Sequence, residues 1–310
     1  MPGAALLAAT VAAVLCPHEV VFVDVAGPTV VRKVTLPSEG LAVFAAPDGR
    51  ILVPLGGEDA TAVIAASGGT ERWAGRVFPL FFDEYDRMQV VMPGVLATLS
   101  YPERVPLQRH PLPGLTGARR AASSLDGRIV AVIPAEAGTH ALILVAAMEF
   151  GTPQAVALPG DASHVVIAND GGFAVAAIGG ATPLVVVLGG GQVRGALPIS
   201  GEVRCLCLAP GGTDVLVGLG TGATGEVLAL KVDPPAKVPL KEHFRTPLPA
   251  PVLALAAAGE EVVAVGGEAL LVLAKGGRRV RGQVGIVGAR DVALLPSEAK
   301  TTVPTWSDKP

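Results

Sequence analysis

The sequence predicts an all-β fold in which seven four-stranded antiparallel sheets form a closed ring. Three observations support this: apolar runs of strand length, turns rich in Asp, Gly and Pro between them, and repetition of this unit along the chain. Runs of about 4–8 residues rich in Val, Leu and Ile are typical of buried strands rather than helices. The unit recurs about every 41 residues, and rings of four-stranded sheets use about 40–45 residues per sheet.

The turn after the first strand of each unit marks the repeat. Its glycine supplies the positive φ that tight hairpins need. The last complete unit shows the pattern best, with apolar runs at 252–257, 261–265 and 269–274 and a more polar fourth run at 278–284. The marker turns are Asp48-Gly49, Pro93-Gly94, Asp126-Gly127, Asp170-Gly171, Gly211-Gly212, Gly259 and Leu295-Pro296.

Two of these turns are near copies, since Asp48-Gly49 and Asp126-Gly127 are each followed by Arg and Ile. They resemble the WD40 and YVTN-type β-propeller superfamily, in which a Pro-Asp-Gly turn commonly joins the first two strands of a blade. The resemblance covers nearly the whole chain and implies a seven-bladed β-propeller. It implies no particular family, because Trp73 is followed by Ala74 rather than by Asp and the YVTN tetrad is absent.

The two ends of the chain are expected to share one blade. Residues 10–36 offer three strands and residues 290–296 a fourth, which would be the innermost strand and would close the ring. Closure leaves only short, protected sheet edges. The chain is therefore predicted to be one domain with a polar tail at 297–310. The predicted blades are 10–36 with 290–296, 38–82, 87–118, 119–159, 161–200, 201–249 and 250–287.

Composition narrows the function classes. Half of the residues are hydrophobic and 16% are charged, with a net charge of −3 and no basic stripe, so nucleic acid is not an expected partner. No apolar run reaches the roughly 20 residues of a spanning helix. The segment 10–15 is expected to be a strand. This expectation favours a cytoplasmic location. The alternative is a secretory or lipid-attachment segment with Cys16 as the attachment point, which leaves a secreted or lipid-anchored location open.

No local motif indicates a cofactor or a metal. The G-x-G-x-x-G match from Gly220 to Gly225 is followed by a predicted strand, whereas dinucleotide binding needs a helix there. We expect a hairpin loop instead. Cys205 and Cys207 fall on one face of a strand and are expected to pack as small hydrophobes, because two thiols are only half of a zinc site. The five histidines are isolated in the sequence.

Charged residues recur near the start of the predicted innermost strands. The repeat therefore predicts that they meet at one mouth of the central channel, where they could bind a carboxylate, a phosphate or an acidic loop. His164 would make such binding weaken as the pH rises through its pKa. The alternative is that these are solvated loop charges paired between neighbouring blades. The predicted mouth residues are Arg87, Arg120, Asp161, His164, Arg204, Arg290 and Asp291.

An aromatic cluster stands out in a chain that is only 4% aromatic. Phe81, Phe82 and Tyr85 would form a partner-binding patch if exposed. If buried, they would fill the join beside the irregular third blade.

Two functions are compatible with these features. The favoured one is a non-catalytic propeller that binds another protein through one face or the channel mouth. The alternative is an enzyme or cofactor-dependent subunit with a site at that mouth, as in lactonases and quinone-dependent dehydrogenases of this architecture, where a small anion could be the ligand. We expect neither a catalytic constellation nor a bound cofactor.

Overall fold

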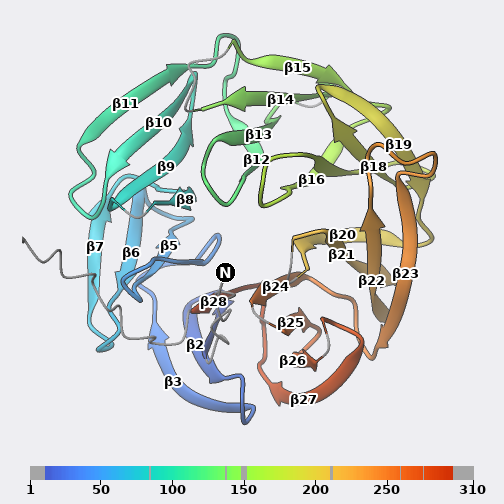
Figure 1. Cartoon of the computed structure of the whole chain (residues 1–310). Coiled ribbons are helices and arrows are strands. Elements are labelled where there is room, and N and C mark those ends of the chain that lie inside the picture. Colours follow the sequence, from blue (N-terminus) through green and yellow to red (C-terminus); the bar gives the residue numbers. More distant parts are fainter. Residues whose placement is uncertain are drawn as a thin grey trace, which may run out of the picture.

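A computed structural model shows seven four-stranded antiparallel sheets arranged as blades around a central axis (Figure 1). The structure describes residues 11–83, 85–136, 138–147, 152–209, 212–258, 260–274 and 276–295. The predicted all-β fold and the predicted number of blades are confirmed. Within the described ranges, no helix is long and apolar enough to cross a membrane.

Each blade runs from an innermost strand at the axis to an outermost strand at the rim. Blade 1 comprises β28 (Asp291–Leu295), β1 (Val11–Cys16), β2 (Glu19–Asp24) and β3 (Thr29–Thr35). Blade 2 comprises β4 (Phe44–Ala45), β5 (Ile51–Pro54), β6 (Ala60–Ile64) and β7 (Thr70–Ala74). Blade 3 comprises β8 (Pro79–Phe82), β9 (Arg87–Met92), β10 (Val95–Ser100) and β11 (Pro106–Pro111). Blade 4 comprises β12 (Ala118–Ser123), β13 (Ile129–Pro134), β14 (Ala141–Ala146) and β15 (Gln154–Ala157).

The remaining blades follow the same order. Blade 5 comprises β16 (Ala162–Ile167), β17 (Ala174–Ile178), β18 (Leu184–Gly189) and β19 (Gln192–Pro198). Blade 6 comprises β20 (Glu202–Leu208), β21 (Asp214–Thr221), β22 (Thr224–Val232) and β23 (Leu240–Leu248). Blade 7 comprises β24 (Ala254–Ala258), β25 (Glu261–Gly266), β26 (Ala269–Ala274) and β27 (Arg279–Gly285).

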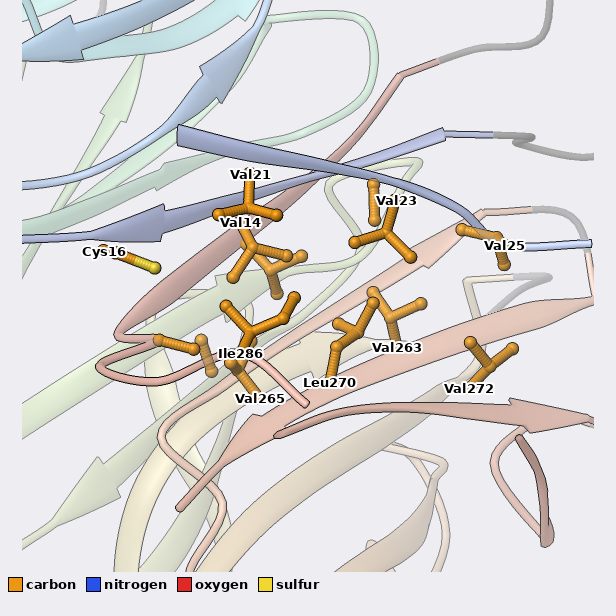
Figure 2. Packing of buried hydrophobic residues seen from close by; sticks show 14 residues of the cluster. Val14, Cys16, Val21, Val23, Val25, Val263, Val265, Leu270, Val272 and Ile286 are labelled. Atoms are coloured by element: carbon orange, nitrogen blue, oxygen red, sulfur yellow. The ribbon is translucent and has the colours of Figure 1, made fainter. Parts of the chain in front are cut away.

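The two middle strands of each blade explain the high apolar content. All five residues of β6 are buried, whereas the outermost strand β27 alternates between exposed and half-buried positions. Middle strands are covered on both faces by neighbouring blades, and so read as continuous apolar runs. Figure 2 shows one such interface, where Val14 and Val21 of blade 1 face Val265 and Leu270 of blade 7. Burying each such side chain contributes about 1.5–3 kcal/mol relative to exposure.

The ring closes as predicted. β1 pairs antiparallel with β28 from Val11 opposite Leu295 to Leu15 opposite Asp291, and β28 is the innermost strand of blade 1 (Figure 1). The predicted strand at 10–15 is β1, and Cys16 at its end is 2% exposed in the core between blades 1 and 7. The predicted tail, 297–310, lies outside the described residues.

Blade 3 differs from its prediction by one strand. β8 pairs with β9, so this blade begins at Pro79 and not at the predicted residue 87. The Pro93-Gly94 turn consequently joins the second strand to the third, whereas Asp48-Gly49, Asp126-Gly127 and Asp170-Gly171 join the first to the second. The strands of this blade are hard to assign from the sequence because β11 both begins and ends with proline. Proline is tolerated in strands mainly at sheet edges.

Bulges recur at matching places in the blades. Each inserts one unpaired residue, which bends the strand and redirects its side chains. The innermost strands of four blades carry a bulge near their start, at Leu80, Arg119, Ser163 and Arg204. The outermost strands of five blades carry a second kind, at Val31, Leu107, Arg194, His243 and Arg281.

Candidate binding site at the channel mouth

A cavity of about 260 Å³ lies where the innermost strands begin. Side chains from β12, β16 and β20, together with Arg290 and Asp291 at the start of β28, contribute its polar lining. Leucines come from the segment ahead of β4 and from the start of β24. Figure 1 shows these strands converging around the axis. Five of the seven predicted mouth residues line this cavity: Arg120, His164, Arg204, Arg290 and Asp291.

The inner bulges position three side chains of the lining, of which Arg120 and His164 are predicted mouth residues. In three consecutive blades the extra residue is Arg119, Ser163 or Arg204, each unpaired with the neighbouring strand. The residue after each bulge, Arg120, His164 or Cys205, lines the cavity. Bulges at the rim of a closed sheet commonly redirect a side chain towards a site. Residues at equivalent positions of three consecutive blades therefore line the same cavity.

The three arginines of the cavity differ in their partners. Arg204 Nη2 lies 2.6 Å from Glu202 Oε2, and Arg290 pairs with Glu39. Arg120 forms no ion pair with any residue that the structure describes, and it is exposed. Both ion pairs are on the surface, where they stabilise the fold by about 0–1 kcal/mol and can rearrange. The cavity therefore has guanidinium groups that remain accessible to an anion.

Asp291 is the one carboxylate among the described residues that line the cavity, and backbone groups hold it. Its Oδ2 accepts a hydrogen bond from Val43 N at 3.0 Å, and its Oδ1 accepts one from Val292 N at 2.9 Å. Burial raises the pKa of Asp291, although both backbone hydrogen bonds and Arg120 act in the opposite direction. This carboxylate thus ties the closing strand to blade 2 and only partly balances the arginine charge.

His164 is uncharged at neutral pH. Burial, and next the positive charge of Arg120, lower its pKa from 6.5 to about 4. Its Nδ1 lies 3.1 Å from Ser163 Oγ. The expected loss of binding as pH rises through the His164 pKa is therefore displaced to acid pH, and the arginines alone set the positive charge of the mouth in the neutral range.

Two predicted mouth residues lie elsewhere. Because β8 is the innermost strand of blade 3, Arg87 follows that strand and lies at the opposite end of the ring. There its Nε lies 2.5 Å from Asp83 Oδ2, and it lines a different hollow. Asp161 lies 3.4 Å from His140 Nε2 and is not part of the cavity lining.

The predicted aromatic patch lies beside Arg87. Phe81 and Phe82 are half-buried, and the Phe82 ring packs edge-to-face on Tyr101 with centroids 5.1 Å apart. Tyr85 is 69% exposed, and the Arg87 guanidinium lies 5.1 Å from its ring centroid. The patch is thus partly buried and partly exposed, and all three residues line the hollow that contains Arg87.

The Gly-rich segment is a hairpin, as expected. β21 and β22 pair up to Thr221 opposite Thr224, and Gly222 has φ +64° in the turn between them. Cys205 and Cys207 are free and pack in the interface between blades 6 and 7. Burial raises the pKa of both thiols, that of Cys207 to about 12, so neither is a thiolate at neutral pH.

Sequence reasoning missed the apolar part of the lining. Leu41, Leu253 and Leu255 line the cavity beside the charged residues. Each lies at or ahead of the start of an innermost strand, which is the same repeat position that predicted the charged residues. Apolar residues at that position could therefore have been predicted from the repeat as well. Ligand sites combine a mainly apolar lining with a few oriented polar groups.

Comparison with known proteins supports the architecture alone. No protein-family model and no curated protein sequence matches the chain. A protein of unknown function from Desulfotomaculum acetoxidans superimposes with a TM-score of 0.72 at 13% identity, over 92% of this chain and 99% of that one. The WD40 repeats of RRP9 superimpose with a TM-score of 0.66 at 11% identity, over 86% and 89%.

A third similar structure is a candidate 6-phosphogluconolactonase from Bacteroides uniformis. It superimposes with a TM-score of 0.64 at 10% identity, over 92% of this chain and 99% of that one. The chain is therefore a seven-bladed β-propeller of WD40-like architecture. Its structural neighbours include WD40-repeat proteins as well as candidate lactonases, so the fold does not select between binding and catalysis.

Proposed function

We propose that this propeller is a non-catalytic interaction module whose channel mouth binds an acidic segment of a partner protein. The observation that carries the proposal is the charge of the cavity: Arg120, Arg204 and Arg290 converge there, and Asp291 is held by backbone donors. Guanidinium groups present planar, forked donors that match carboxylates. A concave site lined by one sign of charge also attracts an oppositely charged partner.

The size of the cavity favours a side chain or a short loop over a large ligand. About 260 Å³ lies just below the range of roughly 300–1,000 Å³ that is typical of small-molecule pockets. The leucines at its edge can contact the apolar stem of a glutamate while Arg120 contacts the carboxylate. An acidic peptide segment would therefore use both parts of the lining.

The test measures binding of a fluorescent peptide with four glutamates, and of the same peptide with four glutamines, by anisotropy at low and high salt. We expect only the glutamate peptide to bind, with an affinity that falls as salt increases. The double variant Arg120→Ala, Arg204→Ala should lose at least tenfold in affinity. Arg109→Ala, Arg279→Ala is a matched control, because it removes the same charge from the outermost strands β11 and β27.

Two outcomes would contradict the proposal. One is equal binding of the two peptides, and the other is equal loss of affinity in the two double variants. Circular dichroism melting curves of all variants check the fold, which charge removal at strand ends should leave intact.

A second candidate function is hydrolysis of an anionic lactone, for which His164 is the supporting observation. It is neutral and lies in the same cavity as Arg120, so it could accept a proton from water while the arginines hold the anion. A pKa of about 4 makes it a weak base at neutral pH, which is why we favour binding. Turnover of 6-phosphogluconolactone that disappears in His164→Gln would favour the enzyme instead.

A further inference from the structure

A hollow of about 480 Å³ lies at the other end of the ring, between the turn that follows β8 and the turn that follows β12. We propose that it is a second binding site, which takes an aromatic side chain with an N–H or O–H donor, such as tryptophan, from a peptide segment of a partner protein. This site does not depend on the proposed function of the channel mouth, since the two share no lining residue.

The walls of the hollow are held in place by hydrogen bonds. Asp83 Oδ1 accepts bonds from Tyr85 N and Arg87 N, each at 2.9 Å, and so links the end of β8 to the start of β9. Gln89 Nε2 donates to Gly127 O at 2.9 Å and ties β9 to the second turn. These bonds hold the named lining residues in place before any ligand arrives, which lowers the entropic cost of binding.

The apolar side of the hollow is unusually exposed. Tyr85 and Leu125 are each 69% exposed, and both line it together with the half-buried rings of Phe81 and Phe82. Large apolar side chains grouped around one concavity are typical of a binding site, whereas scattered ones need no explanation. A flat ring inserted here would cover several of these groups at once.

Among the described residues that line the hollow, each charged side chain has a partner of opposite charge. Arg87 Nε lies 2.5 Å from Asp83 Oδ2, and Arg128 Nε lies 3.4 Å from Asp126 Oδ2. The two pairs together carry no net charge. The described lining therefore favours an uncharged group, whereas the channel mouth holds the unpaired Arg120.

One polar atom of the hollow indicates which functional group the aromatic side chain of the ligand should have. Gln89 is 5% exposed and lines the hollow, and its Oε1 is buried with no donor among the residues that the structure describes. A buried acceptor without a partner is unfavourable, and a ligand that supplies a donor removes that cost. An indole N–H or a phenol O–H meets this need, whereas phenylalanine does not.

The test uses N-acetyl-tryptophanamide as the probe, observed by saturation-transfer NMR on the full chain. We expect saturable binding, at least fivefold weaker binding of the N1-methylated indole analogue, and no saturable binding of N-acetyl-glutamate amide. Leu125→Asp should weaken the tryptophan probe at least fivefold. Val238→Asp is the matched control, because Val238 is 65% exposed and does not line the hollow.

The channel-mouth variant Arg120→Ala, Arg204→Ala should bind the tryptophan probe like the wild type, so failure of one site would not be mistaken for failure of the other. The proposal is overturned if the wild type shows no saturable binding, or if Leu125→Asp and Val238→Asp bind equally. Equal binding of the tryptophan and glutamate probes would refute the uncharged character of the site. Equal binding of the N1-methylated analogue would refute the role of Gln89.

Discussion

The arginines at the two ends of the ring differ in how their charge is balanced. At the channel mouth, Arg204 and Arg290 pair with carboxylates outside the cavity lining, whereas Arg120 has no ion-pair partner among the described residues. The one lining carboxylate, Asp291, is held by backbone donors. At the other end, Arg87 and Arg128 each have a carboxylate within reach from their own turn. An arginine that is paired locally fixes a wall, whereas one without a partner is available to a ligand, although both look alike in the sequence.

The largest expected effect comes from removing the strand that closes the ring and also supplies two mouth residues. Deleting residues 290–310 removes β28 with Arg290 and Asp291, and it exposes the apolar face of β1. We expect loss of cooperative thermal unfolding, or aggregation, in calorimetry. Deleting only 297–310 is the control and should leave the melt unchanged. A cooperative melt in the longer deletion would show that β28 is dispensable for closure.

The next largest expected effect is a loss of folding stability at acid pH, caused by His164 in the mouth cavity. Because the folded-state pKa of His164 is lowered from 6.5 to about 4, the unfolded chain binds the proton more readily between these values. Stability is therefore fully present above about pH 6.5 and falls as the pH decreases towards 4, by roughly 3 kcal/mol. Urea unfolding across this range measures the loss.

The variant His164→Gln should remove most of that pH dependence. His18→Gln is the matched control, because His18 is an exposed histidine that does not line the cavity. Identical pH slopes in the wild type and in His164→Gln would show that another group is responsible.

A smaller effect on stability distinguishes a glycine beside the aromatic hollow from a glycine in an ordinary hairpin turn. Gly127 has φ +70°, and a Cβ there would lie 2.5 Å from the Phe81 ring, so Gly127→Ala adds a clash to backbone strain. We expect a loss of about 2–3 kcal/mol. Gly222 has φ +64° with no atom within 4 Å of such a Cβ, so Gly222→Ala should cost only about 1 kcal/mol. Denaturant midpoints compare the two, and equal losses would mean that Phe81 moves freely.

The smallest effect tests the comparison of the arginines directly. Arg87→Ala removes the ion pair with Asp83 and the contact with the Tyr85 ring, and should cost about 0.5–1 kcal/mol. Arg120→Ala should change stability by less than about 0.5 kcal/mol. Careful thermal denaturation at low salt resolves the difference. A larger loss for Arg120→Ala would mean that its charge is satisfied within the fold.

The repeat made most of this architecture predictable, because each blade needs the same turn chemistry and the same two-sided strands. In the structure, Arg120, Arg204 and Arg290 line one cavity at the end of the ring where the repeat predicts them. It failed for Arg87, because one misassigned strand in blade 3 reverses the end of the ring at which a residue lies. Ion pairs such as Arg290 with Glu39 join residues that are distant in the sequence, so no local pattern could have predicted them.

The outer bulges have a consequence for how copies of this ring meet in a crowded solution. A regular edge strand would offer an uninterrupted row of backbone donors and acceptors to a neighbouring molecule, and the flanking apolar strands would then favour growth into fibrils. The extra residue on the outermost strand of five blades breaks that row, and at three of them it is an arginine or a histidine. These bulges therefore oppose edge-to-edge pairing between copies of the ring.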